Sequence, residues 1–192
     1  MGYYEEFCAI WQQEVTRPGA DKLLDWLHKT DFFEAPASTR FHGACAQGLV
    51  MHSLNVYHAL MERFFDPEDC RESMAICGLL HDLCKANYYK PGTRNVKNET
   101  TGQWEKVPTF TIEDQFPYGH GEKSVYLIER FIRLKPAEAV AIRWHMGGFD
   151  DAVRGGCRAI SEAYDAYPLA VKLHLADLTA TYLMEKGTGL HT

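Results

Sequence analysis

The chain has 192 residues, of which 46% are hydrophobic and 24% charged, and its formal net charge is −6. This composition is typical of a globular domain, and the acidic balance argues against a surface that binds long nucleic acid through its phosphates. No apolar run reaches the roughly 18 residues of a membrane span. The acidic start MGYYEEFCAIWQQE lacks the basic and apolar segments of a signal peptide, so we expect a cytoplasmic protein with no membrane contact.

The first half of the sequence predicts helices separated by turns and one loop. Helices are expected over 3–15, over a short segment after the Pro18–Gly19 turn, over 49–65, and from 66 to about 85. Residues 32–48 contain Pro and Gly breaks and predict a loop. Asp66 fits an N-cap, and Pro67 fits the first position of the helix that follows.

The second half begins with a different pattern. Residues 88–118 predict two strands joined by a turn, and helices are expected again over 119–133, 136–147, 158–165 and 168–185. The predicted fold class is therefore mainly α, a helical bundle with one β-hairpin insertion at about 88–118. All 192 residues are expected to form a single domain, because this length suits one hydrophobic core.

Six cysteines occur without any CxxC spacing, so neither a zinc ribbon nor a disulfide framework is indicated. Cys70, Cys77 and Cys84 repeat every seven residues through an otherwise apolar segment. We expect these three to be small core residues.

Six ionisable residues interrupt helices or helix ends that are otherwise mostly apolar: His52 in LVMHSLNV, His81 and Asp82 in GLLHDLCKAN, His120 in YGHGEKSVYLI, His145 at the end of AVAIRWH, and Asp177 in LAVKLHLADLTATYL. An ionised carboxylate buried without a partner costs many kcal/mol, so the two aspartates need strong partners. Imidazoles and carboxylates that converge from separate helices are typical ligands of a divalent cation.

Simpler roles fit each of these residues taken singly. Asp177 could pair with Lys172 or Arg143, and Lys85 could be a favourable cation at a helix C-terminus. His58 lies about 120° round the helix from His52, so it is expected to face elsewhere. His174, one turn before Asp177, is a candidate outer partner of the site.

The order of these residues resembles the HD-domain superfamily of metal-dependent phosphohydrolases, over about residues 36–184, with 1–35 as preceding helices. The segment PASTRFHGACAQGLVMHSLNV resembles the start of the HD domain in YhaM-type 3′–5′ exoribonucleases. The resemblance implies that four residues are core metal ligands: His52, His81, Asp82 and Asp177. It implies that His120 and His145 serve a second ion and that Lys85 acts on the substrate phosphate. His42 matches an upstream histidine more loosely.

The resemblance implies a phosphomonoesterase or phosphodiesterase that acts on a nucleotide or short oligonucleotide through metal-activated water. Its cofactor would be one or two divalent transition-metal ions (Mn, Fe, Ni, Co or Zn). Asp82 would be catalytic, by bridging the ions or orienting the water, and Lys85 would neutralise charge on the phosphoryl oxygens.

The hairpin adds a prediction about substrate. Its cations, Lys90, Arg94, Lys97 and Lys106, and its aromatic residues, Tyr88, Tyr89, Trp104 and Phe110, suit phosphates and a base. We expect it to overhang the metal cleft, with Lys90 or Arg94 on phosphate and Tyr88 or Trp104 on a flat group. A solvated hairpin whose aromatic residues pack on the helices is equally compatible with this pattern.

Two other functions remain open at this point. Mixed-valence di-iron oxygenases share the HD fold and a similar order of six ligands, and a non-catalytic HD-type regulatory module is also possible from the fold. Iron-dependent oxygen uptake would distinguish the oxygenase.

Overall fold

The computed structural model describes residues 2–186, and this range is mainly helical with one antiparallel two-stranded hairpin, as predicted. The helices are α1 (Tyr3–Glu14), α2 (Ala20–Leu27), α3 (Gly48–Ala59), α4 (Arg71–Leu80), α5 (His120–Glu129), α6 (Pro136–Trp144), α7 (Asp151–Arg154), α8 (Ala159–Ala166) and α9 (Pro168–Thr179). The strands are β1 (Tyr89–Lys97) and β2 (Trp104–Ile112). Among these residues, no helix is both long and apolar enough to cross a membrane.

Short helical turns continue or join these elements. They are the π-helical turns η1 (Leu60–Phe64) and η4 (Ala180–Met184) and the 3-10 turns η2 (Leu83–Lys85) and η3 (Gly147–Phe149). The predicted helices 49–65 and 168–185 therefore each end in a wider π turn. Helix α7 was not predicted; the Asp150 carboxylate caps it by accepting from the N–H groups of Ala152 and Val153.

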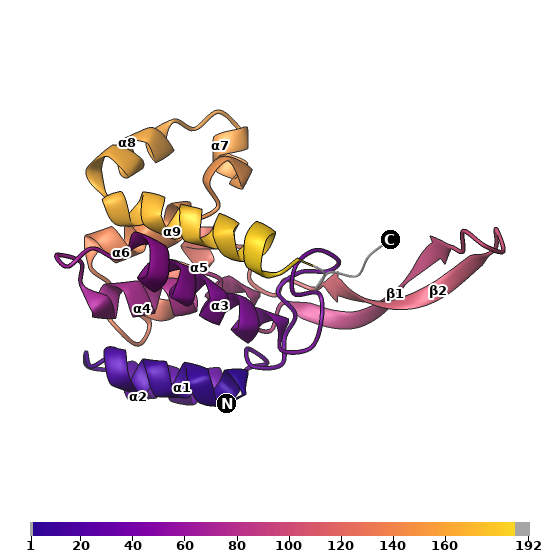
Figure 1. The fold of residues 1–192 in the computed structure, drawn as a ribbon, viewed down its shortest axis with the longest axis horizontal. Coiled ribbons are helices and arrows are strands. Elements are labelled where there is room, and N and C mark those ends of the chain that lie inside the picture. Colours follow the sequence, from indigo (N-terminus) through magenta and orange to yellow (C-terminus); the bar gives the residue numbers. More distant parts are fainter. Residues whose placement is uncertain (1, 187–192) are drawn as a thin grey trace.

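The helices form layers around one core (Figure 1). Helices α1 and α2 lie together on one side of α3 and α4, while α9 packs on α3 and α6 from the other side. The largest fully buried side chains include Phe7, Trp11, Leu27, Leu49 and Leu80. Each such side chain contributes roughly 1.5–3 kcal/mol on burial, so α3 and α4 are held firmly between their neighbours.

Helices α3 and α4 approach most closely at a glycine. A Cβ atom at Gly78 would lie only 2.7 Å from the Cα atom of Tyr57. Glycine is required here because the obstacle is the backbone of the facing helix, which cannot rotate away.

The start of α4 differs from the prediction. Asp66 and Pro67 do not begin a helix; residues 66–69 form a turn in which the Asp66 N–H donates to the Asp69 carboxylate (2.7 Å). The Nζ atom of Lys172 on α9 also donates to both carboxylates. The helix therefore begins only at Arg71.

Two of the three spaced cysteines have the expected environment. Cys77 and Cys84 are buried, but Cys70 is exposed, so its predicted place in the core is wrong. The cause is the late start of α4, which leaves Cys70 just outside the helix.

The hairpin extends away from the helical body (Figure 1). Tyr89 pairs with Ile112 at its base, and Lys97 pairs with Trp104 near its tip. Trp104 is 70% exposed, so its ring does not pack on the helices.

The hairpin segment carries no net charge. Residues 88–118 contain four basic residues, but they also contain four acidic ones: Glu99, Glu105, Glu113 and Asp114. Lys90 forms an ion pair with Glu113, and Asp114 pairs with Lys123 of α5. The segment is therefore neutral overall rather than basic.

Candidate metal centre

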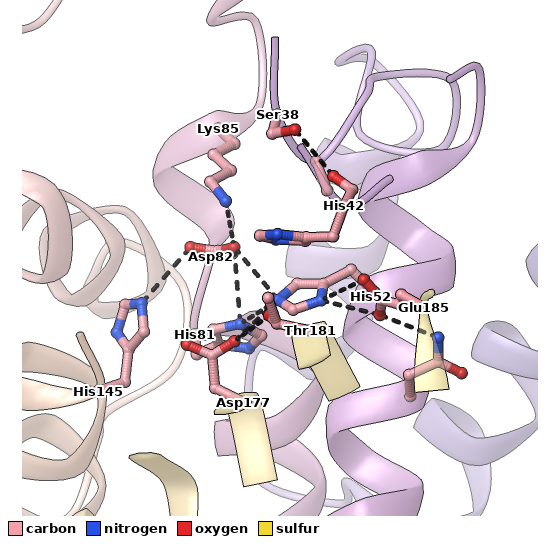
Figure 2. A network of polar contacts seen from close by, with 12 residues as sticks. Ser38, His42, His52, His81, Asp82, Lys85, His145, Asp177, Thr181 and Glu185 are labelled. Carbon is pink, nitrogen blue, oxygen red and sulfur yellow. Dashed lines mark hydrogen bonds and ion pairs between the residues drawn. The ribbon is translucent and has the colours of Figure 1, made fainter. Parts of the chain in front are cut away.

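Four of the predicted ligands meet at the centre of the helical layers (Figure 2). His52 comes from α3, His81 and Asp82 follow the last turn of α4, and Asp177 comes from α9. The Nε2 atom of His52 lies 3.2 Å from Nε2 of His81 and 3.2 Å from Oδ1 of Asp177. The structure thus brings together residues that are up to 125 positions apart in sequence.

Three imidazoles are oriented by hydrogen bonds on their far side. Nδ1 of His81 donates to the Gly78 carbonyl (3.0 Å), and Nδ1 of His145 donates to the Ile142 carbonyl (2.7 Å). Nδ1 of His52 donates to a carboxylate oxygen of Glu185 (3.0 Å). Because these acceptors carry no hydrogen, each Nδ1 holds the ring proton, and in the neutral rings Nε2 presents a lone pair to the centre.

The two oxygens of Asp82 face different groups of imidazoles. Oδ2 lies 3.6 Å from Nε2 of both His52 and His81, while Oδ1 lies 2.8 Å from Nε2 of His120 and 3.5 Å from Nε2 of His145. This arrangement suits a carboxylate that bridges two ions. His120 and His145, predicted for a second ion, therefore lie beside the first four residues.

The electrostatics of the cluster fit a cation. Burial lowers the pKa of His81 to about 3, so its Nε2 is unprotonated. Burial also opposes a charge on His52, but its hydrogen bonds with Asp177 and Glu185 outweigh burial and raise the pKa of His52 to about 10. Without metal, His52 is therefore protonated and lies beside the lone pair of His81 and the carboxylates. A divalent ion can take the place of the His52 proton.

One buried nitrogen atom without a hydrogen-bond partner also supports a metal ion in this cluster. Nε2 of His145 is fully buried and has no hydrogen-bond partner among the described residues, although it points toward Asp82. A buried polar atom without a partner costs roughly 1–3 kcal/mol, and a metal ion at this position would remove that cost. The donor set of imidazole nitrogens and carboxylate oxygens suits Zn, Fe, Co, Ni or Mn.

Lys85 also faces the cluster. Its Nζ donates to Oδ2 of Asp82 (2.6 Å), and its side chain is 12% exposed. Burial opposes a charge on Lys85, but Asp82 outweighs it and raises the pKa of this ammonium above its ordinary value. Lys85 is therefore a cation directed at the site rather than a solvated group at a helix end.

The simpler partners considered for Asp177 are engaged elsewhere. Lys172 pairs with Asp66 and Asp69, and Arg143 pairs with Glu122 and Asp150.

Three further histidines of the described range differ in how they relate to the cluster. Nε2 of His58 lies 2.7 Å from a carboxylate oxygen of Glu6, so His58 faces away from the site. Nδ1 of His174 donates to the carbonyl of His145 (2.7 Å), which makes His174 an outer support of the cluster. The ring of His42 lies beside that of His52 in a tilted arrangement, with ring centroids 4.9 Å apart, and burial lowers the pKa of His42 to about 4.

Sequence reasoning missed Glu185 and Thr181. Glu185 is 3% exposed and holds His52, while the Thr181 hydroxyl donates to Oδ1 of Asp177 (3.3 Å). Thr181 and Glu185 lie four and eight positions after Asp177, which is the spacing of one helix face. That spacing is the one sequence signal for them, since neither residue type stands out at a helix end.

The cluster lies on one wall of an open cavity of about 920 Å³. Outside the cluster, the cavity is lined by residues that include Arg40, Phe41, Tyr89, Ile112, Phe149 and Arg154. Arg40 and Phe41 come from the 32–48 loop, and their contact is of the cation–π type (5.0 Å).

The hairpin reaches this cavity only with its base. Tyr88, Lys90, Arg94 and Trp104 do not line it, whereas Tyr89 and Ile112 do. Tyr88 packs instead against the Lys123 ammonium, 5.2 Å from its ring centroid. The expected overhang, with these four residues on substrate, is not what the structure has, because the strands run outward from the site.

Comparison of the chain with protein-family models, curated proteins and solved structures finds no match. The structure itself supplies buried groups of His, Asp, Glu and Cys residues whose ligand atoms are close enough to hold a metal ion.

Proposed function

We propose that the protein is a metal-dependent phosphohydrolase of the HD type that acts on a nucleotide or short oligonucleotide. The observation that carries the proposal is the convergence of His52, His81 and Asp177 on Asp82, with Nε2 atoms directed at carboxylates. A divalent ion bound there would lower the pKa of a water ligand and polarise a phosphoryl oxygen.

Asp82 and Lys85 have distinct roles in this proposal. Asp82 bridges the two groups of imidazoles and orients the attacking water. Lys85, held as a cation by Asp82, offsets negative charge that develops on the phosphoryl oxygens.

The cavity walls support a phosphorylated substrate with a flat group. Arg40 and Arg154 offer guanidinium groups for further phosphates, and the exposed rings of Phe41 (62%) and Phe149 (54%) offer surfaces on which a base can stack. These residues take the role that the sequence assigned to the hairpin.

The first test is metal content. Protein purified without chelator should contain about one to two transition-metal ions per chain by mass spectrometry, because ligand atoms of at least three His, Asp or Cys residues lie close together at each position. The same protein should then hydrolyse at least one member of a panel of nucleotide monoesters and diesters.

Chelated protein is the control and should regain activity when metal is returned. Metal-loaded protein that hydrolyses nothing in the panel contradicts the proposal. Oxygen uptake by the iron-loaded form would favour the oxygenase, and neither activity would favour a regulatory module.

Lys85→Ala should lower kcat by about 10²–10³-fold and leave the metal content unchanged, because the ammonium contacts a ligand rather than the metal. Steady-state kinetics with mass spectrometry would measure both. Lys90→Ala is the matched control, since Lys90 pairs with Glu113 outside the cavity and its loss should change neither quantity. Unchanged turnover in Lys85→Ala would remove Lys85 from the mechanism.

A further inference from the structure

Cys84 lies directly beside the carboxylate–imidazole cluster. Its Sγ atom is 3.4 Å from Nδ1 and 3.8 Å from Nε2 of His120, and its side chain is buried. The N–H of Cys84 donates to the hydroxyl of Ser124 (3.0 Å), which fixes the turn η2 against α5. The backbone that carries the sulfur is therefore fixed, and a single side-chain torsion separates Sγ from it.

Three ligand atoms are grouped at the second ion position. The atoms offered by Asp82, Cys84 and His120 all lie within 4.8 Å of one another. Nε2 of His145 lies 3.5 Å from Oδ1 of Asp82, the oxygen that also faces His120, and it is buried without a hydrogen-bond partner in the described chain. A tetrahedral ion with bonds of about 2.0–2.3 Å requires ligand atoms roughly 3.3–3.7 Å apart. Nε2 of His120 lies 2.8 Å from Oδ1 of Asp82 and 3.8 Å from Sγ of Cys84, on either side of this range.

We propose that Cys84 is a sulfur ligand at this second position. The other ligands there are Asp82, His120 and His145. The position takes a thiophilic divalent ion such as Zn²⁺ or Co²⁺ in preference to Mg²⁺ or Mn²⁺, because a thiolate is a soft donor. On binding, the thiol releases its proton to solvent and the sulfur electron pair forms the metal bond, so no oxidation occurs.

The two positions then differ in chemistry. His52, His81 and Asp177, with Oδ2 of Asp82, supply nitrogen and oxygen alone, whereas Cys84 adds sulfur on the side of Oδ1. This inference rests on the proposed function only in that a metal binds here. The added claim is that one ion has only nitrogen and oxygen ligands, whereas the other also has a sulfur ligand.

Cobalt spectroscopy tests the inference without an activity assay. Cys45, Cys70 and Cys157 are exposed and are replaced by serine first, so that surface thiols do not contribute. The resulting chain, loaded with Co²⁺, should show a near-ultraviolet sulfur-to-cobalt charge-transfer band. Adding Cys84→Ser should abolish the band, and adding Cys77→Ser should retain it, because Cys77 lies on α4 with its sulfur 4.0 Å from the Glu138 carbonyl.

Each outcome decides the inference. Bound cobalt without the band, or a band that survives Cys84→Ser, overturns it and leaves the proposed phosphohydrolase intact. Failure to bind cobalt overturns both. A Cys84-dependent band in a protein that hydrolyses no phosphate ester supports the sulfur ligand and contradicts the function. If Cys84→Ser does not fold, Cys8→Ser and Cys77→Ser are added together instead, which leaves Cys84 as the last thiol of the chain. A band in that cobalt-loaded chain supports the inference, and bound cobalt without a band overturns it.

Discussion

Asp82→Asn is expected to lower hydrolysis by about 10³-fold or more and to deplete the bound metal. Both oxygens of Asp82 face imidazole nitrogens, and an amide brings no charge and only one acceptor. A rate of hydrolysis lowered about 10³-fold corresponds to a loss of several kcal/mol of transition-state stabilisation, since each 1.4 kcal/mol changes a rate about tenfold. Metal analysis and single-substrate kinetics on the same preparation would measure the two effects together.

The control for Asp82→Asn is Asp114→Asn. Asp114 pairs with Lys123 outside the cluster, so this change alters the same chemical group without touching the site. Circular dichroism should show that both variants keep the helical fold. An Asp82→Asn protein with normal metal content and turnover would disprove the bridging role.

Arg17→Met is expected to destabilise the protein by about 3–5 kcal/mol. The Arg17 guanidinium donates two hydrogen bonds to the Glu138 carboxylate (2.7 and 2.8 Å), and it also pairs with Glu72 (3.1 Å). The side chain of Glu138 is fully buried. Removing one partner of a buried pair leaves an uncompensated charge, which is costly. Urea unfolding would measure the difference, because the midpoint should fall sharply.

Arg71→Met is the matched control. Arg71 also pairs with a glutamate, Glu14, but its side chain is 52% exposed, so its loss should cost about 0–1 kcal/mol. Equal losses in the two variants would show that burial of Glu138 is not the cause.

The effect of Arg17 also depends on pH. Burial opposes the ionisation of Glu138, but hydrogen bonds from Arg17, Ser73 and Lys135 outweigh it and lower its pKa. A lowered pKa in the folded state gives stability that is complete above the ordinary carboxyl value of 4.5 and is lost as the pH falls through the folded value. Unfolding in urea should therefore become easier on the acid side in the wild-type chain.

The candidate metal ligands could be recognised in the sequence because they are ionisable residues in segments that are otherwise apolar. His52, His81 and Asp177 interrupt apolar helices, and such groups need partners. Glu185 could not be recognised in the same way, because a glutamate at a helix end looks like ordinary surface charge. Cys84 looked like a small apolar residue, since sequence does not reveal that its turn faces α5.

The helix boundaries show the limit of local patterns. Asp66 and Pro67 have the residue types of a helix start, but Lys172, more than 100 positions later, holds Asp66 and Asp69 in a turn. The hairpin was found from its β-branched and aromatic residues, yet its direction depends on contacts with the 32–48 loop, such as the hydrogen bond from the Tyr89 hydroxyl to the Ala37 carbonyl. Tertiary contacts decided both features.

Gly78 makes no bond to a metal, yet it fixes how wide the site is. Its missing side chain lets the backbones of α3 and α4 touch at Tyr57, and its carbonyl orients His81. Any larger residue would separate the helices and increase the distance between His52 and His81. Natural variants that keep the site should therefore tolerate exchanges among apolar residues around it, but selection should retain glycine at position 78 as strictly as a ligand.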